Sequence, residues 1–132
     1  MKKTVFVIAI TLIAVIVAGS SVIETFTVTS QGDQAVIEWV SGVEGNLLKY
    51  KVERSEDNKS FTSIQEVYPQ GNYSNYVYID DNIMKLTSQR IYYYRIKMIF
   101  ADGSFDVSDV KSVTLTFSGL QETWGSIKAM FR

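Results

Sequence analysis

The sequence predicts an all-β fold, a seven-stranded antiparallel sandwich, with an apolar helix before it and a short amphipathic helix after it. Short runs of alternating apolar and polar residues, the period of a strand with one buried face, follow one another from residue 23 to residue 117. Turn residues such as glycine, asparagine, aspartate and proline separate these runs. With 46% hydrophobic and 13% aromatic residues in a chain of 132, one buried core is expected.

The amino-terminal segment has the composition of an export signal or a membrane anchor. Lys2 and Lys3 give a positive start, residues 5–18 are continuously apolar, and the first acidic residue is Glu24. Residues 1–21 are therefore expected to be a signal peptide or an anchor helix. In either case the domain behind them is expected to lie outside the cytoplasm.

Two fates of this segment remain open. Ala18 and Ser20 are small residues at the spacing of a signal-peptidase site, and cleavage after Ser20 would release a secreted or periplasmic domain. If it is not cleaved, a helix over residues 5–23 would be about 28 Å long, close to the roughly 30 Å hydrocarbon core of a bilayer. The chain would then stay attached to the membrane.

The first three predicted strands span residues 23–30, 34–41 and 47–55, with a loop over residues 42–46 between the second and third. Alternation in the second and third strands assigns these side chains to the core: Ala35, Ile37, Trp39, Leu48, Tyr50 and Val52. The side chains expected in water on the opposite face of the third strand are Lys49, Lys51 and Glu53.

Four more strands are predicted over residues 60–68, 74–80, 91–100 and 105–117. Pro69 ends the first of these, because proline cannot donate to a strand ladder. The side chains assigned to the core from these strands are Phe61, Ile64, Tyr76, Tyr78, Tyr92, Tyr94, Ile96, Met98, Val113, Leu115 and Phe117. The strand over residues 91–100 alternates most regularly and is expected at the centre of the core.

The tail over residues 119–132 changes from the period of a strand to that of a helix. The residues that carry the pattern, four apolar and two basic, are Leu120, Trp124, Ile127, Lys128, Phe131 and Arg132. Their spacing predicts a short amphipathic helix, and cations near its carboxyl end suit the helix dipole. This helix either folds back on its own sandwich or docks, through those six residues, on a membrane surface or another subunit.

The composition excludes most catalytic chemistry. The chain has no cysteine and no histidine, which rules out disulfides, thiol nucleophiles, Ser-His-Asp relays and the usual zinc ligands. A formal charge of −1 without a basic face indicates no nucleic-acid partner. No catalytic residue, metal ligand or cofactor is therefore assigned. Tyr68, Tyr73 and Tyr93 fall outside the predicted core faces and are the candidates for stacking on a carbohydrate.

Several residues in this strand order follow the pattern of a known family. Trp39 stands on the second strand as a core tryptophan, and Leu86 and Tyr92, six residues apart, have the spacing of a tyrosine corner. Together with the sequences of residues 50–57 and 92–97, these features resemble a fibronectin type III domain of the exported type found in Bacteroidetes and Chlorobi relatives. The resemblance implies Greek-key connections and a binding or spacer module. The resemblance and the strand alternation together give the expected core and fold residues, which are Trp39, Tyr50, Leu86, Tyr92, Tyr94 and Ile96.

These inferences together predict an exported, non-enzymatic module without cofactors. The expected organisation is a signal or anchor over residues 1–21, a fibronectin type III-like domain over 22–118 and an amphipathic tail over 119–132. The expected role is that of a membrane-tethered subunit of a larger cell-envelope assembly, whose partners are other proteins and, through residues 5–23, the membrane. The alternative is a soluble secreted adhesion or carbohydrate-binding module released by signal cleavage.

Overall fold

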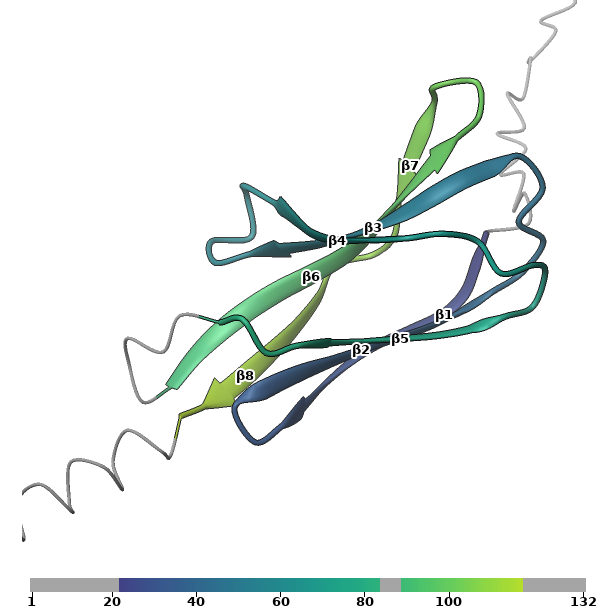
Figure 1. The fold of residues 1–132 in the computed structure, drawn as a ribbon. Coiled ribbons are helices and arrows are strands. Elements are labelled where there is room, and N and C mark those ends of the chain that lie inside the picture. The colour runs from purple at the N-terminus through teal and green to yellow at the C-terminus, as the bar shows by residue number, and fades with distance from the viewer. Residues whose placement is uncertain (1–21, 84–88, 118–132) are drawn as a thin grey trace, which may run out of the picture.

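The computed structural model describes residues 22–83 and 89–117, which form strands and no helix (Figure 1). The eight strands of the described chain are β1 (Ile23–Gln31), β2 (Gln34–Ser41), β3 (Leu47–Ser55), β4 (Thr62–Val67), β5 (Asn75–Asp80), β6 (Gln89–Phe100), β7 (Phe105–Val107) and β8 (Lys111–Thr116). The helices predicted over residues 1–21 and 119–132 lie outside the described ranges, and Ile23, the last residue of the alternative anchor helix over 5–23, belongs to β1.

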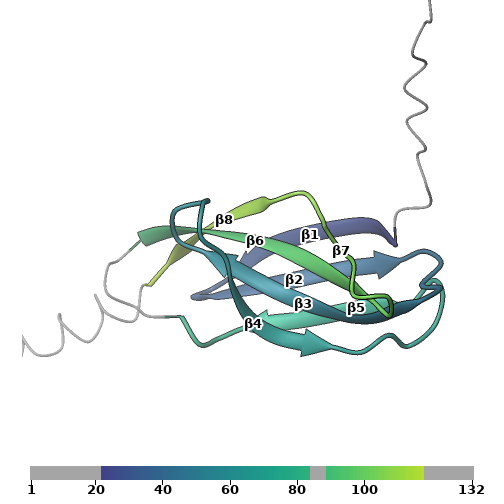
Figure 2. The same ribbon diagram turned by 90° about the horizontal axis from the view of Figure 1, so that it is seen from above.

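The strands form two antiparallel sheets that face each other as layers (Figure 2). One sheet has three strands in the order β1-β2-β5. The other has five, with β4, β3 and β6 side by side and both β7 and β8 paired with β6. The connections from β2 to β3 and from β4 to β5 pass from one sheet to the other. The predicted all-β architecture with antiparallel sheets is confirmed.

The core lies between the sheets because each strand turns its apolar side chains inward at period two. The buried core residues are Ile23, Ala35, Ile37, Trp39, Leu47, Tyr50, Val52, Tyr76, Ile83, Tyr92, Tyr94, Ile96, Met98, Val113, Leu115 and Phe117. Trp39 stacks on Tyr76 with ring centroids 5.1 Å apart and meets the edge of Tyr50 at 5.5 Å. These three rings join β2 and β5 of one sheet to β3 of the other.

The predicted seventh strand over residues 105–117 is split into β7 and β8. Lys97 pairs with Val107 but Tyr94 pairs with Lys111, so the chain opposite β6 holds one extra residue. Ser108 occupies the step: its N–H donates to the carbonyl of Ile96 and its Oγ accepts from the N–H of Ile96, both at 2.8 Å. The serine side chain thus replaces a ladder bond, and the strand is interrupted there.

Two side chains of β3 differ from their prediction, Leu48 in the face that it occupies and Glu53 in its exposure. Leu48, predicted to be in the core, is 52% exposed, because the register with β6 shifts between Leu47 and Lys49 and Leu47 takes the inward place. Glu53, predicted to be solvated, is 7% exposed. Its carboxylate accepts a hydrogen bond from Arg95 Nε at 2.8 Å, so its charge is paired on the outer face of the sheet.

Candidate interaction sites

Two of the three tyrosines proposed for stacking lie close together in the sequence and open to solvent. Tyr68 is 65% and Tyr73 64% exposed, and both belong to the connection between β4 and β5. Tyr93 is half-buried on β6. The neighbouring connection, from β2 to β3, adds the exposed side chain of Val43. We call these two connections, residues 42–46 and 68–74, the loop pair.

A buried carboxylate fastens the loop pair to the core. Glu44 is 4% exposed, and its Oε2 accepts hydrogen bonds from the hydroxyls of Tyr50 at 2.6 Å and Tyr76 at 2.7 Å. Its Oε1 accepts from the N–H of Gly71 at 2.7 Å. Three donors compensate the loss of water around the charge. Burial and the hydrogen bond to Glu44 hold the pKa of the Tyr50 hydroxyl well above its ordinary value.

Further hydrogen bonds tie the two connections to each other. The N–H of Tyr73 donates to the carbonyl of Gly42 and the N–H of Glu44 donates to Asn72 Oδ1, both at 2.9 Å. Tyr73 has φ of 56°, in the left-handed region that non-glycine residues rarely adopt. An exposed aromatic residue is thus held in a costly backbone conformation by surrounding bonds, a combination that recurs at ligand-contacting sites.

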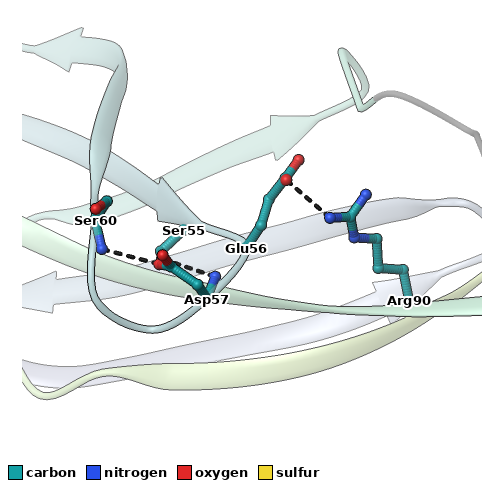
Figure 3. Close-up of polar contacts among 5 residues, drawn as sticks. All are labelled: Ser55, Glu56, Asp57, Ser60 and Arg90. Carbon is teal, nitrogen blue, oxygen red and sulfur yellow. Dashed lines mark hydrogen bonds and ion pairs between the residues drawn. The ribbon is translucent and has the colours of Figure 1, made fainter.

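A polar cleft lies at the opposite end of β3 from the loop pair, and Figure 3 shows polar contacts among five of its residues. It has a volume of about 410 Å³. The residues that line it are Arg54, Ser55, Glu56, Asp57, Ser60, Thr62 and Arg90. It therefore combines cations, carboxylates and hydroxyls over the turn between β3 and β4.

Asp57 in this cleft organises the turn. Its Oδ1 accepts from the N–H groups of Lys59 and Ser60 and from Ser55 Oγ, each at 2.9 Å (Figure 3). Bonds from Ser60, Lys59 and Ser55 lower the pKa of the Asp57 carboxyl to about 2, because each stabilises the charged form. A carboxylate with these donors shapes the loop, as in an Asx turn.

The two arginines of the cleft are paired with carboxylates of different exposure. Arg90 Nη2 lies 2.8 Å from Glu56 Oε2, and both side chains are partly in water (Figure 3). Arg54 Nη1 lies 2.7 Å from Oδ2 of Asp80, which is 1% exposed and also accepts from the Tyr94 hydroxyl at 2.7 Å. The outer pair can open at little cost, whereas the inner pair is structural.

The residues singled out from the sequence fall into three groups. Trp39, Tyr50, Tyr92, Tyr94 and Ile96 are all buried in the core. Leu86 lies outside the described residues, so its pairing with Tyr92 stays a prediction. The tail residues proposed for docking also lie outside the described ranges, and they are Leu120, Trp124, Ile127, Lys128, Phe131 and Arg132.

Glu44 is a buried polar residue that sequence reasoning missed as part of a site. Glu44 stands in a loop between Val43 and Gly45, where no periodic pattern indicates burial. Across residues 22–83 and 89–117, no group of three histidine, cysteine, aspartate or glutamate residues is placed to hold a metal ion. No helix in those same ranges is long and apolar enough to cross a membrane.

Comparisons with known proteins give structural neighbours only. Neither a family model nor a curated protein sequence matches the chain. Pectate lyase PelI from Erwinia chrysanthemi, solved with tetragalacturonic acid, is similar with a TM-score of 0.53 and 14% identity over 67% of this chain and 27% of that one. The likeness concerns the fold alone.

Two further neighbours are more distant. Pectate lyase Pel3 from Pectobacterium carotovorum has a TM-score of 0.47 and 19% identity over 67% of this chain and 26% of that one. A β-1,2-glucanase from Parabacteroides distasonis has a TM-score of 0.45 and 16% identity over 74% of this chain and 12% of that one. This chain spans about a quarter or less of the length of these neighbours. None of the three is described as a fibronectin type III protein.

Proposed function

We propose that the protein is a non-catalytic interaction module that binds another protein through the loop pair. The observation that carries this proposal is the bracing of two exposed tyrosines, Tyr68 and Tyr73, on loops fastened by the buried Glu44 carboxylate. Tyrosine supplies a large contact area with few rotatable bonds, so a rigidly presented tyrosine loses little entropy on binding.

The carboxylates that could have served an enzyme have structural partners. Asp57 accepts three bonds within its turn, Asp80 is bound to Arg54 and Tyr94, and Glu53 is paired with Arg95. A general acid or base must be free to exchange a proton with a substrate. These engagements support a binding role over a catalytic one.

The fold that we propose is a fibronectin type III sandwich with Greek-key connections. The order β1-β2-β5 in one sheet and β4-β3-β6 in the other supports it, with β7 and β8 together counted as the seventh strand. The proposed setting is the cell envelope, with the domain outside the cytoplasm. The support for that setting is the apolar segment over residues 5–18.

The binding proposal is tested by co-purification of the full chain in mild detergent. Replacing Tyr68 and Tyr73 together by serine should reduce recovery of a stoichiometric partner at least about tenfold, the effect of losing one to two hot-spot residues. Ile91→Ser, a change of an exposed apolar residue on β6, is the control and should leave recovery unchanged. Equal recovery with all three proteins would refute the role of the loop pair.

A second candidate function is carbohydrate binding, which the polar cleft favours. Paired arginine and carboxylate groups beside the Ser60 and Thr62 hydroxyls can donate to and accept from neighbouring sugar hydroxyls. Affinity electrophoresis in gels containing neutral or acidic polysaccharide tests this. Retardation that Arg90→Ala abolishes and Tyr68→Ser does not would assign sugar binding to the cleft. No retardation in any gel would exclude this candidate.

A further inference from the structure

The strand β5 has one side that is open for hydrogen bonding. Its other side pairs with β2, and in the part of the chain that the structure describes no strand covers the free edge. Just before β5, in the same register, the N–H of Ser41 donates to the carbonyl of Ser74 at 2.9 Å, and the N–H of Ser74 donates to Ser41 Oγ at 3.0 Å, so both backbone groups of Ser74 face β2. Bonded and non-bonded pairs alternate, so the N–H and C=O groups of Asn75, Val77 and Ile79 point away from β2.

β5 lacks the features that protect β1, β4 and β7 from pairing. Exposed edges are usually blunted by charge, proline, a bulge or short length. β7 has three residues, β1 meets β2 through a register shift, and β4 has both a register shift and the charged Glu66. β5 runs without a register shift, and its one charged residue, Asp80, is buried. A further strand can therefore be added to this edge.

The sequence of the free edge is suited to pairing with itself. Asn75–Ile79 reads Asn-Tyr-Val-Tyr-Ile, with a tyrosine on each side of Val77. In an antiparallel pair centred on Val77, each Val77 faces its copy and Asn75 faces Ile79. Every outward N–H and C=O group of the three residues then finds a partner. Residues 75–79 contain no charge, so no like charges oppose each other.

We propose that β5 pairs antiparallel with β5 of a second copy of this chain, centred on Val77, so that two three-stranded sheets become one continuous sheet. An identical strand satisfies both free edges with one symmetric contact, which closes the assembly as a dimer. The pairing also covers Val77 and Ile79, which are 62% and 44% exposed in the single chain. Adjacent copies of Val77 and Ile79 would extend the apolar outer face of β5 across the contact between the two β5 strands.

Single cysteines provide a test, because the natural chain has none. Opposed residues of a bonded antiparallel pair have Cα atoms about 5.5 Å apart, within the range of a disulfide, whereas two copies of residue 79 would be about 14 Å apart. The full chain in mild detergent, carrying Val77→Cys, should therefore form disulfide dimers on oxidation. The rate should exceed that of Ile79→Cys by on the order of tenfold or more.

Two controls separate strand pairing from chance collision or association in a micelle. Ile91→Cys, exposed on β6, should cross-link as slowly as Ile79→Cys. A mixture of Asn75→Cys and Ile79→Cys chains should form mixed dimers faster than either chain dimerises alone. Equal rates at positions 77, 79 and 91, a maximum away from 77, or the absence of mixed dimers would overturn the proposal. Serine substitutions in the loop pair should leave these rates unchanged, so the two proposals can fail separately.

Discussion

Glu44 and Asp80 are buried carboxylates that each accept hydrogen bonds from several core side chains or loop groups. Glu44 accepts bonds from Tyr50, Tyr76 and Gly71, and Asp80 accepts from Arg54 and Tyr94. A buried charge is tolerated only where donors replace its water, so each carboxylate fixes the positions of the groups around it. Both are therefore expected to stabilise the fold in proportion to those bonds.

Glu44→Gln should lower the free energy of unfolding by about 2 kcal/mol, because the amide loses charge-assisted bonds and turns a donor toward other donors. The measurement is urea unfolding followed by tryptophan fluorescence. Glu24→Gln, an exposed change on β1, is the matched control and should cost less than about 0.5 kcal/mol. Equal effects from the two substitutions would show that the hydrogen bonds of Glu44 contribute nothing to the free energy of unfolding.

Tyr73→Gly separates stability from binding. Glycine adopts the positive φ of 56° without steric strain. The free energy gained by removing this strain should exceed the entropic cost of ordering glycine on folding by about 0.5 kcal/mol. Asn58→Gly, at φ of 60°, should gain less, because asparagine tolerates the left-handed region. The Tyr73→Gly protein should nevertheless lose partner binding, because it lacks the tyrosine ring. A less stable Tyr73→Gly protein, measured in urea, would argue against strain at this position.

Individual side chains were predictable from the sequence where burial follows a local period. Trp39, Tyr50 and Tyr94 are buried because strand alternation directs them inward. The burial of Glu44 is different, since its partners Tyr50 and Tyr76 come from two strands that meet only in the folded chain. No local pattern contains that information. The exposure of Tyr68 and Tyr73 was predictable because they flank the predicted break at Pro69 and Gly71.

The strands, as elements, were predictable in place apart from local interruptions, one of which makes eight strands of the predicted seven. The register shift at Leu47–Lys49 and the step at Ser108 each move one residue out of the ladder. A one-residue shift reverses the face of a side chain, which is why Leu48 is exposed despite its alternation. Such shifts depend on the partner strand β6, so the sequence of β3 or β8 alone could not indicate them.

The turn between β3 and β4 should make stability depend on acid pH. Folding lowers the pKa of Asp57 to about 2 from its ordinary 3.8. A carboxyl group shifted downward stabilises the folded state above its ordinary pKa and loses this contribution as the pH falls to about 2. Asp57→Asn should therefore be less stable than the natural protein at pH 5, and the difference in urea midpoints should shrink as the pH falls toward 2.

The control for this turn is Thr29→Asn, an exposed change on β1 that introduces no titrating group. Its difference from the natural protein should be the same at both pH values. A gap between Asp57→Asn and the natural protein that does not narrow toward pH 2 would mean that the Asp57 charge is not what holds the turn.

In the whole molecule the two carboxylates connect the sheets at opposite ends. Glu44 joins Tyr76 on β5 to Tyr50 on β3, and Asp80 on β5 is joined to Tyr94 on β6. The residues bonded along β5, 76 and 80, are about 13 Å apart at the rise of a strand. The chain has no disulfide, so these carboxylate and tyrosine bonds act where a covalent cross-link between sheets could stand.

Alkaline titration should reveal both connections. Burial, and then a hydrogen bond to a carboxylate, raise the pKa values of Tyr50 and Tyr94 above the ordinary 10.0. A group with a raised pKa stabilises the folded state below its ordinary pKa, and this contribution declines as the pH rises above about 10. Absorbance at the tyrosinate band should thus show these two hydroxyls ionising together with unfolding.

Tyr50→Phe and Tyr94→Phe are the matched variants, and each should remove one ionising group from the step that accompanies unfolding. Circular dichroism recorded on the same samples reports the loss of the sheets. If all tyrosines ionise while the sheet signal persists, the hydroxyls of Tyr50 and Tyr94 are not locked to their carboxylates.

The described chain begins at the start of β1 and ends after β8, at opposite ends of the sandwich (Figures 1 and 2). β1 and β8 lie beside each other, and each pairs antiparallel with a strand of its own sheet. Ladder bonds lie perpendicular to the strands, so a pull on the two ends would load many of them at once, in shear. A domain whose two ends lie at opposite ends of the sandwich would therefore resist mechanical tension well if each end were attached to a different structure.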